Sequence, residues 1–428
     1  MQNHSFKTLS LALLASTVMI PAVVAQDSEE VMSVYDKYRP DFSAKGFRTG
    51  GFLFYPAVRV DGEFDSNIFS TDDANVADVD DFIAVIKPSF GLVSDWNNNY
   101  FALNASADIG RYTDNDTENF EDFNFGASGR IDISRGSNIF ADLTYADRHE
   151  PRGAADAVGN QAEQTQYSTL KAVGGFMRDE GVMSFAVEGS YEKSDYDNTP
   201  LNGGGTQIND DRDREVVNGS VRLGYDLNED YEAFAKFTVT KVTYDDSRQD
   251  GGPLRDSDGW DVIGGAAIDV GGKSKGEFYV GYVKRDFDSA TLAAAGNISD
   301  FKFGASLLWS ATNLTSVRFA IDRDVTETTL GSVNGKPASG VLSTLYSFRM
   351  EHELRRNLLL NASGSYNNQD YQNIGREDHV TKFGAGMRYL FNDNLSLNAD
   401  YGYDKRATGV DNLDYKRHSF IVSLAAQW

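Results

Sequence analysis

The stretch "HSFIVSLAAQW", residues 418–428, carries its large apolar side chains at every second position. Successive side chains of a β-strand point to opposite faces of a sheet. One face of this stretch therefore carries a continuous apolar row: Phe420, Val422, Leu424, Ala426 and Trp428. The other face carries Ile421, Ser423, Ala425 and Gln427. The pattern predicts a strand with one face against an apolar medium.

The same alternation recurs along most of the chain. In "YFALNASADIG" (100–110) and "NLSLNADYGYD" (394–404), apolar and polar residues alternate with a period of two, and no stretch repeats at 3.6 residues. Pairs of such runs flank short polar turns, among them "WNN" (96–98), "RGS" (135–137) and "FND" (391–393). Alternation over four to eight residues indicates strands, and the turns join them into eight hairpins.

The other ends of the strands open into long polar stretches, such as "FSTDDANVADVDD" (69–81), "RHEPRGAADAVGNQAEQT" (148–165) and "NNQDYQNIGRED" (367–378). A first strand at 52–69 and the closing strand bring the expected total to about 18. Short turns on one side and long loops on the other are typical of transmembrane β-barrels. We therefore predict an all-β protein, an antiparallel β-barrel of the outer membrane with short periplasmic turns and long extracellular loops.

A secreted β-sandwich, propeller or solenoid is the soluble alternative. Those folds bury one face of each sheet in a protein core, and their loops do not sort by length onto alternate ends. In lipid, every backbone polar group must be satisfied within the protein, so the sheet must close. The sorted loops favour the membrane barrel.

The first residues resemble a secretory signal. Lys7 precedes an apolar run from Leu9 to Ile20, and small residues lead up to Ala25. A run of about 12 residues is shorter than the roughly 20 that span a bilayer, which argues against a membrane anchor. We expect cleavage after Ala25, a periplasmic N-terminal segment at 26–50 and the barrel at 51–428.

Composition excludes one class of partner. Lys and Arg total 40 against 64 Asp and Glu, a net charge of −24, and the chain has no Cys. Nucleic acid binding depends on basic patches that neutralise phosphates. We therefore expect no nucleic acid partner.

The segment "RPDFSAKGFRTGGFLFYPAVRVDGEFDSNIFST" (39–71) resembles the start of the barrel in the putative β-barrel porin family, which is often found beside exopolysaccharide-synthesis genes. The matching features are Arg39-Pro40, a Gly46-x-Arg48-x-Gly50 pattern, "FLFYP" and "DSNIF". Ala44 stands where members often carry Pro. The resemblance implies an outer-membrane barrel with a link to surface polysaccharide.

Motifs for catalysis and cofactors are incomplete. "GGKSKG" (271–276) lacks the first glycine of a phosphate-binding loop, because position 267 is Ala. "EHELRR" (351–356) lacks the second His of a zincin. "DNDTENFEDF" (114–123) has Asn119 in place of the turn glycine of a calcium loop. The four His residues after position 25 are scattered, so nothing selects a pair for a barrel lipase. We expect no enzyme, no cofactor and no bound metal.

Strand phase predicts which charges face a lumen. If the apolar face meets lipid, ten charged residues point inward. The candidate pore-lining residues among them are Arg130, Arg222, Arg318, Arg349, Arg388, Asp108, Glu188 and Asp400. Asp132 and Asp142 share this phase. These charges either pair across a wet wall or form a constriction with opposed acidic and basic faces, and both interpretations imply water inside.

Two functions follow from this architecture. The first is a porin-like channel for small polar solutes or oligosaccharide, with a hypothetical tie to exopolysaccharide export. The second is a non-conducting structural or adhesive barrel whose acidic loops bind cations. The expected partners are outer-membrane lipid, lipopolysaccharide and the barrel-assembly machinery, which would read the closing strand through Phe420 to Trp428. Polysaccharide-export components are hypothetical partners.

Acidic residues are concentrated in the predicted long loops. They are Asp72, Asp73, Asp78, Asp80, Asp81, Asp210, Asp211, Asp213, Asp245 and Asp246. Such clusters either keep the loops solvated or create a negative potential above a mouth, which would favour cations.

Overall fold

The computed structural model describes residues 31–72, 76–157, 160–245, 253–330, 337–410 and 413–428. The expected signal sequence and its cleavage position at Ala25 lie outside these ranges. In the described part, no helix has the length and apolar character needed to cross a membrane.

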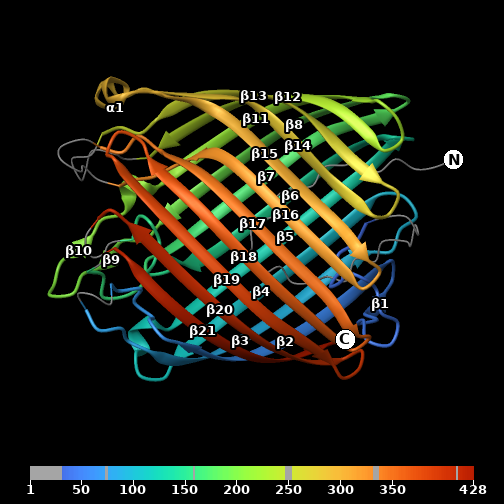
Figure 1. Cartoon of the computed structure of the whole chain (residues 1–428), viewed down its shortest axis with the longest axis horizontal. Coiled ribbons are helices and arrows are strands. Elements are labelled where there is room, and N and C mark those ends of the chain that lie inside the picture. The colour runs from blue at the N-terminus through green and yellow to red at the C-terminus, as the bar shows by residue number, and fades with distance from the viewer. Residues whose placement is uncertain (1–30, 73–75, 158–159, 246–252, 331–336, 411–412) are drawn as a thin grey trace.

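Within the described residues, eighteen antiparallel strands close into one barrel (Figure 1). They are β2 (Phe52–Asp65), β3 (Asp81–Ser94), β4 (Tyr100–Tyr112), β5 (Phe120–Ser134), β6 (Ser137–His149), β7 (Gln166–Glu180), β8 (Met183–Tyr196), β11 (Arg214–Asp226), β12 (Tyr231–Tyr244), β13 (Ser257–Val270), β14 (Ser274–Phe287), β15 (Ile298–Thr312), β16 (Thr315–Thr326), β17 (Val341–Arg355), β18 (Leu358–Tyr371), β19 (Arg376–Leu390), β20 (Leu395–Thr408) and β21 (Tyr415–Gln427). The predicted fold class and strand number are confirmed.

The barrel closes where the last strand pairs with the first barrel strand. β21 runs antiparallel to β2, with Phe420 opposite Phe64 and Gln427 opposite Ala57. The backbone N–H of Trp428 extends this ladder by donating to the carbonyl oxygen of Pro56 (3.1 Å). Closure pairs the edges that an open sheet would leave exposed.

The exposed apolar side chains of the described barrel strands share one phase of the strand alternation, apart from Tyr100, which lies opposite Arg130. Phe420 is 52% exposed and Val422 57%, and Tyr401 lies opposite Phe420 on the neighbouring strand. On the opposite phase, charged side chains pair with one another. The apolar phase is therefore the outer, lipid-facing surface, and the charged phase faces the lumen.

The two ends of the barrel differ. One, the short-turn end, holds the eight tight hairpins and the end of β21. The other, the long-loop end, holds α1 (Ala290–Ala295), β9 (Thr199–Pro200), β10 (Thr206–Gln207) and two 3-10 turns, Asp116–Glu118 and Asp210–Arg212 (Figure 1). β1 (Phe47–Thr49) pairs with β2 at the short-turn end.

Several strand ends differ from the sequence-based expectation. The stretch 367–378 was expected as a long loop, yet only residues 372–375 lie between β18 and β19. Most of its polar residues are strand residues; Arg376 and Asp378, for example, bond to each other (2.8 Å). The first strand ends at Asp65 rather than at Phe69, because the Asn67 side chain organises a turn by bonding Thr71. Polarity alone does not mark a loop when the inner wall is itself polar.

Candidate functional site: the barrel lumen

All eight residues predicted to line a pore lie on barrel strands, on the phase opposite the exposed apolar side chains. They are distributed around the wall and do not form one ring. Asp108 is on β4, Arg130 on β5, Glu188 on β8, Arg222 on β11, Arg318 on β16, Arg349 on β17, Arg388 on β19 and Asp400 on β20.

Most of these charges have partners on the same wall. Arg222 makes two hydrogen bonds to the carboxylate of Glu232 (2.9 and 3.0 Å), and its guanidinium lies over the Phe234 ring at 4.3 Å. Arg130 pairs with Asp132 at 3.0 Å. Pairing lowers the cost of placing charges on a wall surrounded by lipid. Arg318 instead has an exposed side chain in the lumen.

Residues 31–46, here called the N-terminal segment, occupy the short-turn end of the lumen. Val34 is fully buried against Leu359 and Leu390. The Val34 backbone N–H donates to Ser316 Oγ (2.8 Å). The next N–H, of Tyr35, donates to a carboxylate oxygen of Glu351 (3.0 Å). Inner-wall side chains therefore satisfy the backbone of this segment.

Tyr35 is also held through its ring and hydroxyl. The Arg388 guanidinium lies 4.8 Å and that of Arg349 5.7 Å from the ring centroid. Asn361 Nδ2 donates to the Tyr35 hydroxyl oxygen (3.0 Å). A guanidinium over an aromatic face is attracted by about 0.5–2 kcal/mol. Two of the predicted pore arginines therefore hold the N-terminal segment.

Further contacts fix the segment along its length. Arg39 pairs with Glu353 at 2.8 Å, and Lys37 Nζ donates to the Asn313 carbonyl oxygen (2.7 Å). Gly46 has φ +70°, and a Cβ there would lie 2.6 Å from the Tyr55 ring, so only glycine fits. The N-terminal segment therefore joins the barrel at Gly46, the first residue of the Gly46-x-Arg48-x-Gly50 pattern.

At the long-loop end, residues 150–157 reach across the barrel. They follow β6, yet the Asp156 carboxylate accepts hydrogen bonds from Thr328 Oγ1 (2.7 Å) and the Thr329 N–H (3.1 Å), which follow β16. Arg406 on β20 donates to the Gly153 carbonyl oxygen at 3.4 Å. This crossing loop therefore contacts walls far from its own strands.

Buried ion pairs anchor the crossing loop at its base. Arg212 makes two hydrogen bonds to the Glu150 carboxylate (3.0 and 2.5 Å), and Arg152 makes two to Glu118 (2.9 and 2.6 Å). Paired charges with this bidentate geometry restrict a loop to one orientation.

The acidic loop residues have several roles. Asp81 accepts hydrogen bonds from the Asn115 backbone and side-chain nitrogens (3.0 and 2.8 Å), and Asp78 accepts one from Asn67. Burial raises the pKa of Asp213 to about 6, and the negative charges of nearby aspartates contribute to this rise. The hydrogen bond from the Tyr196 N–H acts in the opposite direction and lowers this pKa. Asp73 and Asp246 lie outside the described residues.

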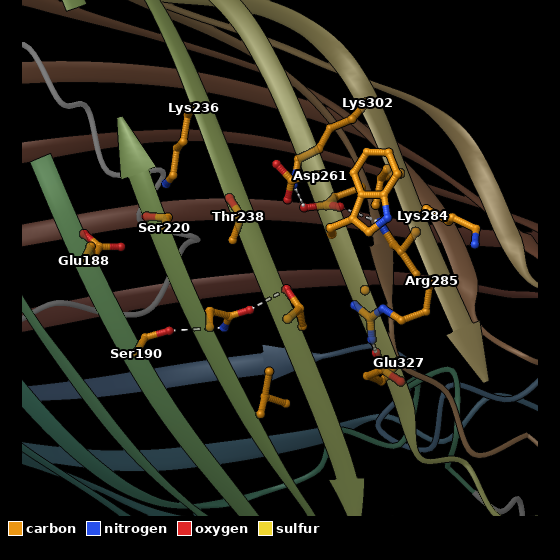
Figure 2. Close-up of a pocket in the computed structure, with 18 residues that line it drawn as sticks. Glu188, Ser190, Ser220, Lys236, Thr238, Asp261, Lys284, Arg285, Lys302 and Glu327 are labelled. Carbon is orange, nitrogen blue, oxygen red and sulfur yellow. Dashed lines mark hydrogen bonds and ion pairs between the residues drawn. The ribbon is translucent and has the colours of Figure 1, made fainter. Parts of the chain in front are cut away.

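A polar cavity of about 350 Å³ lies against the inner wall formed by β8 and β11–β16 (Figure 2). Lys302 bridges Asp324 (2.6 Å) and Asp261 (3.3 Å). Glu188, Lys236 and a row of hydroxyl side chains also line the cavity. The contacts of the N-terminal segment with barrel strands are instead concentrated on β16–β21, at the short-turn end.

The four histidines among the described residues do not converge. His149 bonds Asp122, His352 bonds Thr315, His379 bonds Tyr366 and His418 bonds Tyr401. Among the described residues, no group of three or more His, Cys, Asp or Glu side chains could hold a metal ion.

A model of the putative beta-barrel porin 2 family matches residues 39–428. The chain belongs to this family. A search of curated proteins returned no match. The family assignment confirms the resemblance drawn from the segment at 39–71, and it makes the chain an outer-membrane β-barrel of the porin type.

Solved structures similar to this chain include an outer membrane protein and a siderophore receptor. OpdO of Pseudomonas aeruginosa has a TM-score of 0.46 and 12% identity, covering 88% of this chain and 98% of that one. OccK1 (OpdK) of the same organism has a TM-score of 0.45 and 10% identity, covering 88% and 99%. The siderophore receptor PiuA of Acinetobacter baumannii has a TM-score of 0.49 and 11% identity, covering 90% and 82%. Similarity at this level carries no conclusion about solutes.

Two features of this porin were missed in the sequence. The luminal position of residues 31–46 was not predicted, although the unusual Arg39-Pro40 and Gly46 signals fall in it. The crossing loop was expected only as one of several long loops. Both depend on contacts between residues that are 150 or more positions apart in the sequence. The alternation of apolar and polar residues along a strand carries no information about such contacts.

Proposed function

We propose that the chain is an outer-membrane diffusion channel for small polar solutes or oligosaccharide. The observation that carries the proposal is the polar cavity on the inner wall of β8 and β11–β16. A barrel of about 18 strands is wide enough for an aqueous interior. The N-terminal segment narrows the opposite part of the short-turn end, so solute passes along the cavity wall.

The acidic loops favour cations at the outer mouth in this proposal. Asp80 is exposed, and the chain carries a net charge of −24. Low-dielectric walls focus the potential of such charges at an opening. The aspartates that organise the loops, Asp78 and Asp81, contribute to the same field from fixed positions.

A non-conducting structural or adhesive barrel is the second candidate. The observation that favours it is the occupation of both ends of the lumen, by the N-terminal segment at one and the crossing loop at the other. Here the acidic loops would bind divalent cations and lipopolysaccharide. A link to exopolysaccharide export belongs to either candidate and is supported by the family resemblance alone.

Single-channel recording in planar bilayers tests the proposal. The wild-type barrel should give discrete conductance steps, and a variant lacking residues 31–45 should give larger steps because the short-turn end is wider. The matched control keeps the whole N-terminal segment and changes only the exposed Lys45 to Gln. Its conductance steps should be the same size as those of wild type. Absence of conductance in wild type and deletion variant alike would favour the structural barrel.

A further inference from the structure

The cavity has two halves that differ in how their charges are satisfied. On the half formed by β13–β16, the Lys302 ammonium lies between two carboxylates, and Arg285 pairs with Glu327 at 2.5 Å. Arg285 also bonds Ser257 Oγ (3.3 Å). Each of these charges therefore has an ion-pair partner, although the half keeps one net negative charge because two carboxylates share the Lys302 ammonium.

The half formed by β8, β11 and β12 presents free charge. Glu188 and Lys236 both line the cavity and are half-buried. Neither makes a hydrogen bond or ion pair with another described residue, although Lys236 interacts electrostatically with Glu277. The hydroxyls of Ser220 and Thr238 also lack a hydrogen-bond partner among the described residues. One carboxylate, one ammonium and two hydroxyls are therefore available to a solute.

Strand register fixes how these four groups are arranged. Glu188 lies opposite Ser220, and Ser220 lies opposite Thr238. Lys236 precedes Thr238 by two residues on the same face. With strands about 4.8 Å apart and a rise of about 3.4 Å per residue, the Cα atoms of Glu188 and Lys236 are about 12 Å apart. Figure 2 shows Ser220 between them, with the Lys236 amine directed towards it.

The neighbouring hydrogen bonds keep this wall rigid. Asn218 Nδ2 donates to Ser190 Oγ (3.1 Å), and Thr240 Oγ1 donates to Asn218 Oδ1 (2.7 Å). This chain of three side chains crosses β8, β11 and β12 directly beside the free groups (Figure 2). A preorganised wall loses little freedom when a solute binds.

The charge pattern discriminates between classes of solute. An anion is attracted by Lys236 and repelled by Glu188, and a cation meets the reverse. A neutral polyol can form hydrogen bonds with all four groups, but it brings no charge to balance that of Glu188 or Lys236. A solute with both an ammonium and a carboxylate satisfies both side chains at once. Its ammonium donates to Glu188, and its carboxylate accepts from Lys236. Hydrogen bonds between ionised groups are about twice as strong as neutral ones.

We propose that this wall is a binding site for small zwitterions of the α-amino acid type. The inference rests on the proposed channel function and names the solute class of that channel. The hydroxyls of Ser220 and Thr238 lie between the two charges, where they bond the solute carboxylate or side chain.

Binding is tested on the detergent-solubilised full chain by saturation-transfer difference NMR with L-glutamine. Wild type should give a saturable signal. Glu188→Gln and Lys236→Met should each weaken binding about tenfold, because each removes one charge-assisted bond. The double exchange Glu188→Lys with Lys236→Glu should retain binding, since one acid and one base remain. Asp142→Asn, a luminal carboxylate outside the cavity, should bind as wild type does.

Two ligand analogues test the same point without altering the protein. N-acetyl-glutamine lacks the ammonium and glutamine amide lacks the carboxylate, so both should bind wild type about tenfold more weakly than glutamine. No saturable signal from glutamine, or equal signals from glutamine and both analogues, would overturn the zwitterion site.

Liposome swelling separates this inference from the proposed channel. Proteoliposomes should swell faster in glutamine than in xylose, a neutral sugar of similar mass, and Lys236→Met should abolish the difference. Binding without swelling in either solute would leave the site and reject the channel. Equal swelling in both solutes, with no binding, would leave the channel and reject the site.

Discussion

The cost of an arginine on the outer face should depend on its depth, and β12 allows the depth to be calculated. Ala235 lies on the exposed phase opposite Leu223, four residues after Tyr231, an exposed aromatic at the short-turn end. At about 3.4 Å per residue and a tilt of about 40°, Ala235 lies about 10 Å above Tyr231, near the centre of an apolar band about 25 Å tall. Ala235→Arg should therefore destabilise the barrel by about 2–4 kcal/mol.

A shallow position provides the contrast. Leu397 is the third residue of β20 and lies opposite Leu424 and Tyr389, close to the short-turn end. From the sequence alone, Leu397 could lie at the bilayer midplane, where Leu397→Arg would destabilise the barrel by about 2–4 kcal/mol. The structure places it near the interface, where the cost is about 0–1 kcal/mol.

The luminal control must also be chosen from the structure. Asn398→Arg is the control that strand phase indicates, but Asn398 is buried and accepts a hydrogen bond from Arg388 (3.0 Å). An arginine introduced at position 398 would lie against Arg388, and the two positive charges would repel each other. Asp142 lies five residues after Ser137, the first residue of β6, and its side chain is exposed to the lumen. Asp142→Arg should therefore be tolerated.

Urea unfolding of the barrel in phospholipid vesicles, followed by tryptophan fluorescence, measures these differences. The expected order of destabilisation is Ala235→Arg, then Leu397→Arg, then Asp142→Arg. Equal costs for Ala235→Arg and Asp142→Arg would mean that the outer and inner faces have been assigned wrongly.

Three further predictions follow from the closing strand, the N-terminal segment and the long loops. Deleting Trp428 together with Phe420→Ser should lower the yield of folded barrel in the outer membrane, seen as loss of heat-modifiable migration; an unchanged yield would contradict an assembly role. Arg39→Met should increase current fluctuations by releasing the N-terminal segment, and Glu353→Gln should do the same; quiet traces from both would contradict the anchor. Because the pKa of Asp213 is raised to about 6 from 3.8, its ionisation opposes loop packing, and this penalty grows as pH rises from about 4 to 6. Hydrogen-exchange protection of the loop between β8 and β11, corrected for the intrinsic exchange rate, should thus be higher at pH 5 than at pH 7.5. Asp213→Asn should remove this difference.

Much of the barrel follows from side-chain alternation. The closing strand, the eight hairpins and the inward phase of residues such as Arg222 and Asp400 could be read from a period of two, because each face of a barrel strand meets one medium. Strand ends were harder to predict. In 367–378, polar side chains indicated a loop, whereas most of these residues belong to β18 and β19, and Arg376 and Asp378 bond each other on the inner wall.

The contents of the lumen could not be read in this way. Tyr35 lies under Arg349 and Arg388, more than 300 residues away in sequence, and Asp156 contacts Thr328 across the mouth. Such contacts follow no period. The cavity charges were only partly foreseen: Glu188 was a candidate, whereas Lys236 was not singled out, because nothing in "DYEAFAKFTVT" distinguishes a paired lysine from an unpaired one.

Reversal potential in a potassium chloride gradient across planar bilayers tests most directly whether a polar, cation-favouring passage runs through the barrel. Wild type should conduct and prefer potassium, and the preference should fade at high salt as exposed charges are screened beyond about 8–10 Å. Changing Asp72, Asp73 and Asp80 to Asn should reduce it, while Asp78 and Asp81 are kept because they organise the loops. A barrel that conducts no ions, or one that prefers chloride in both forms, would contradict the account.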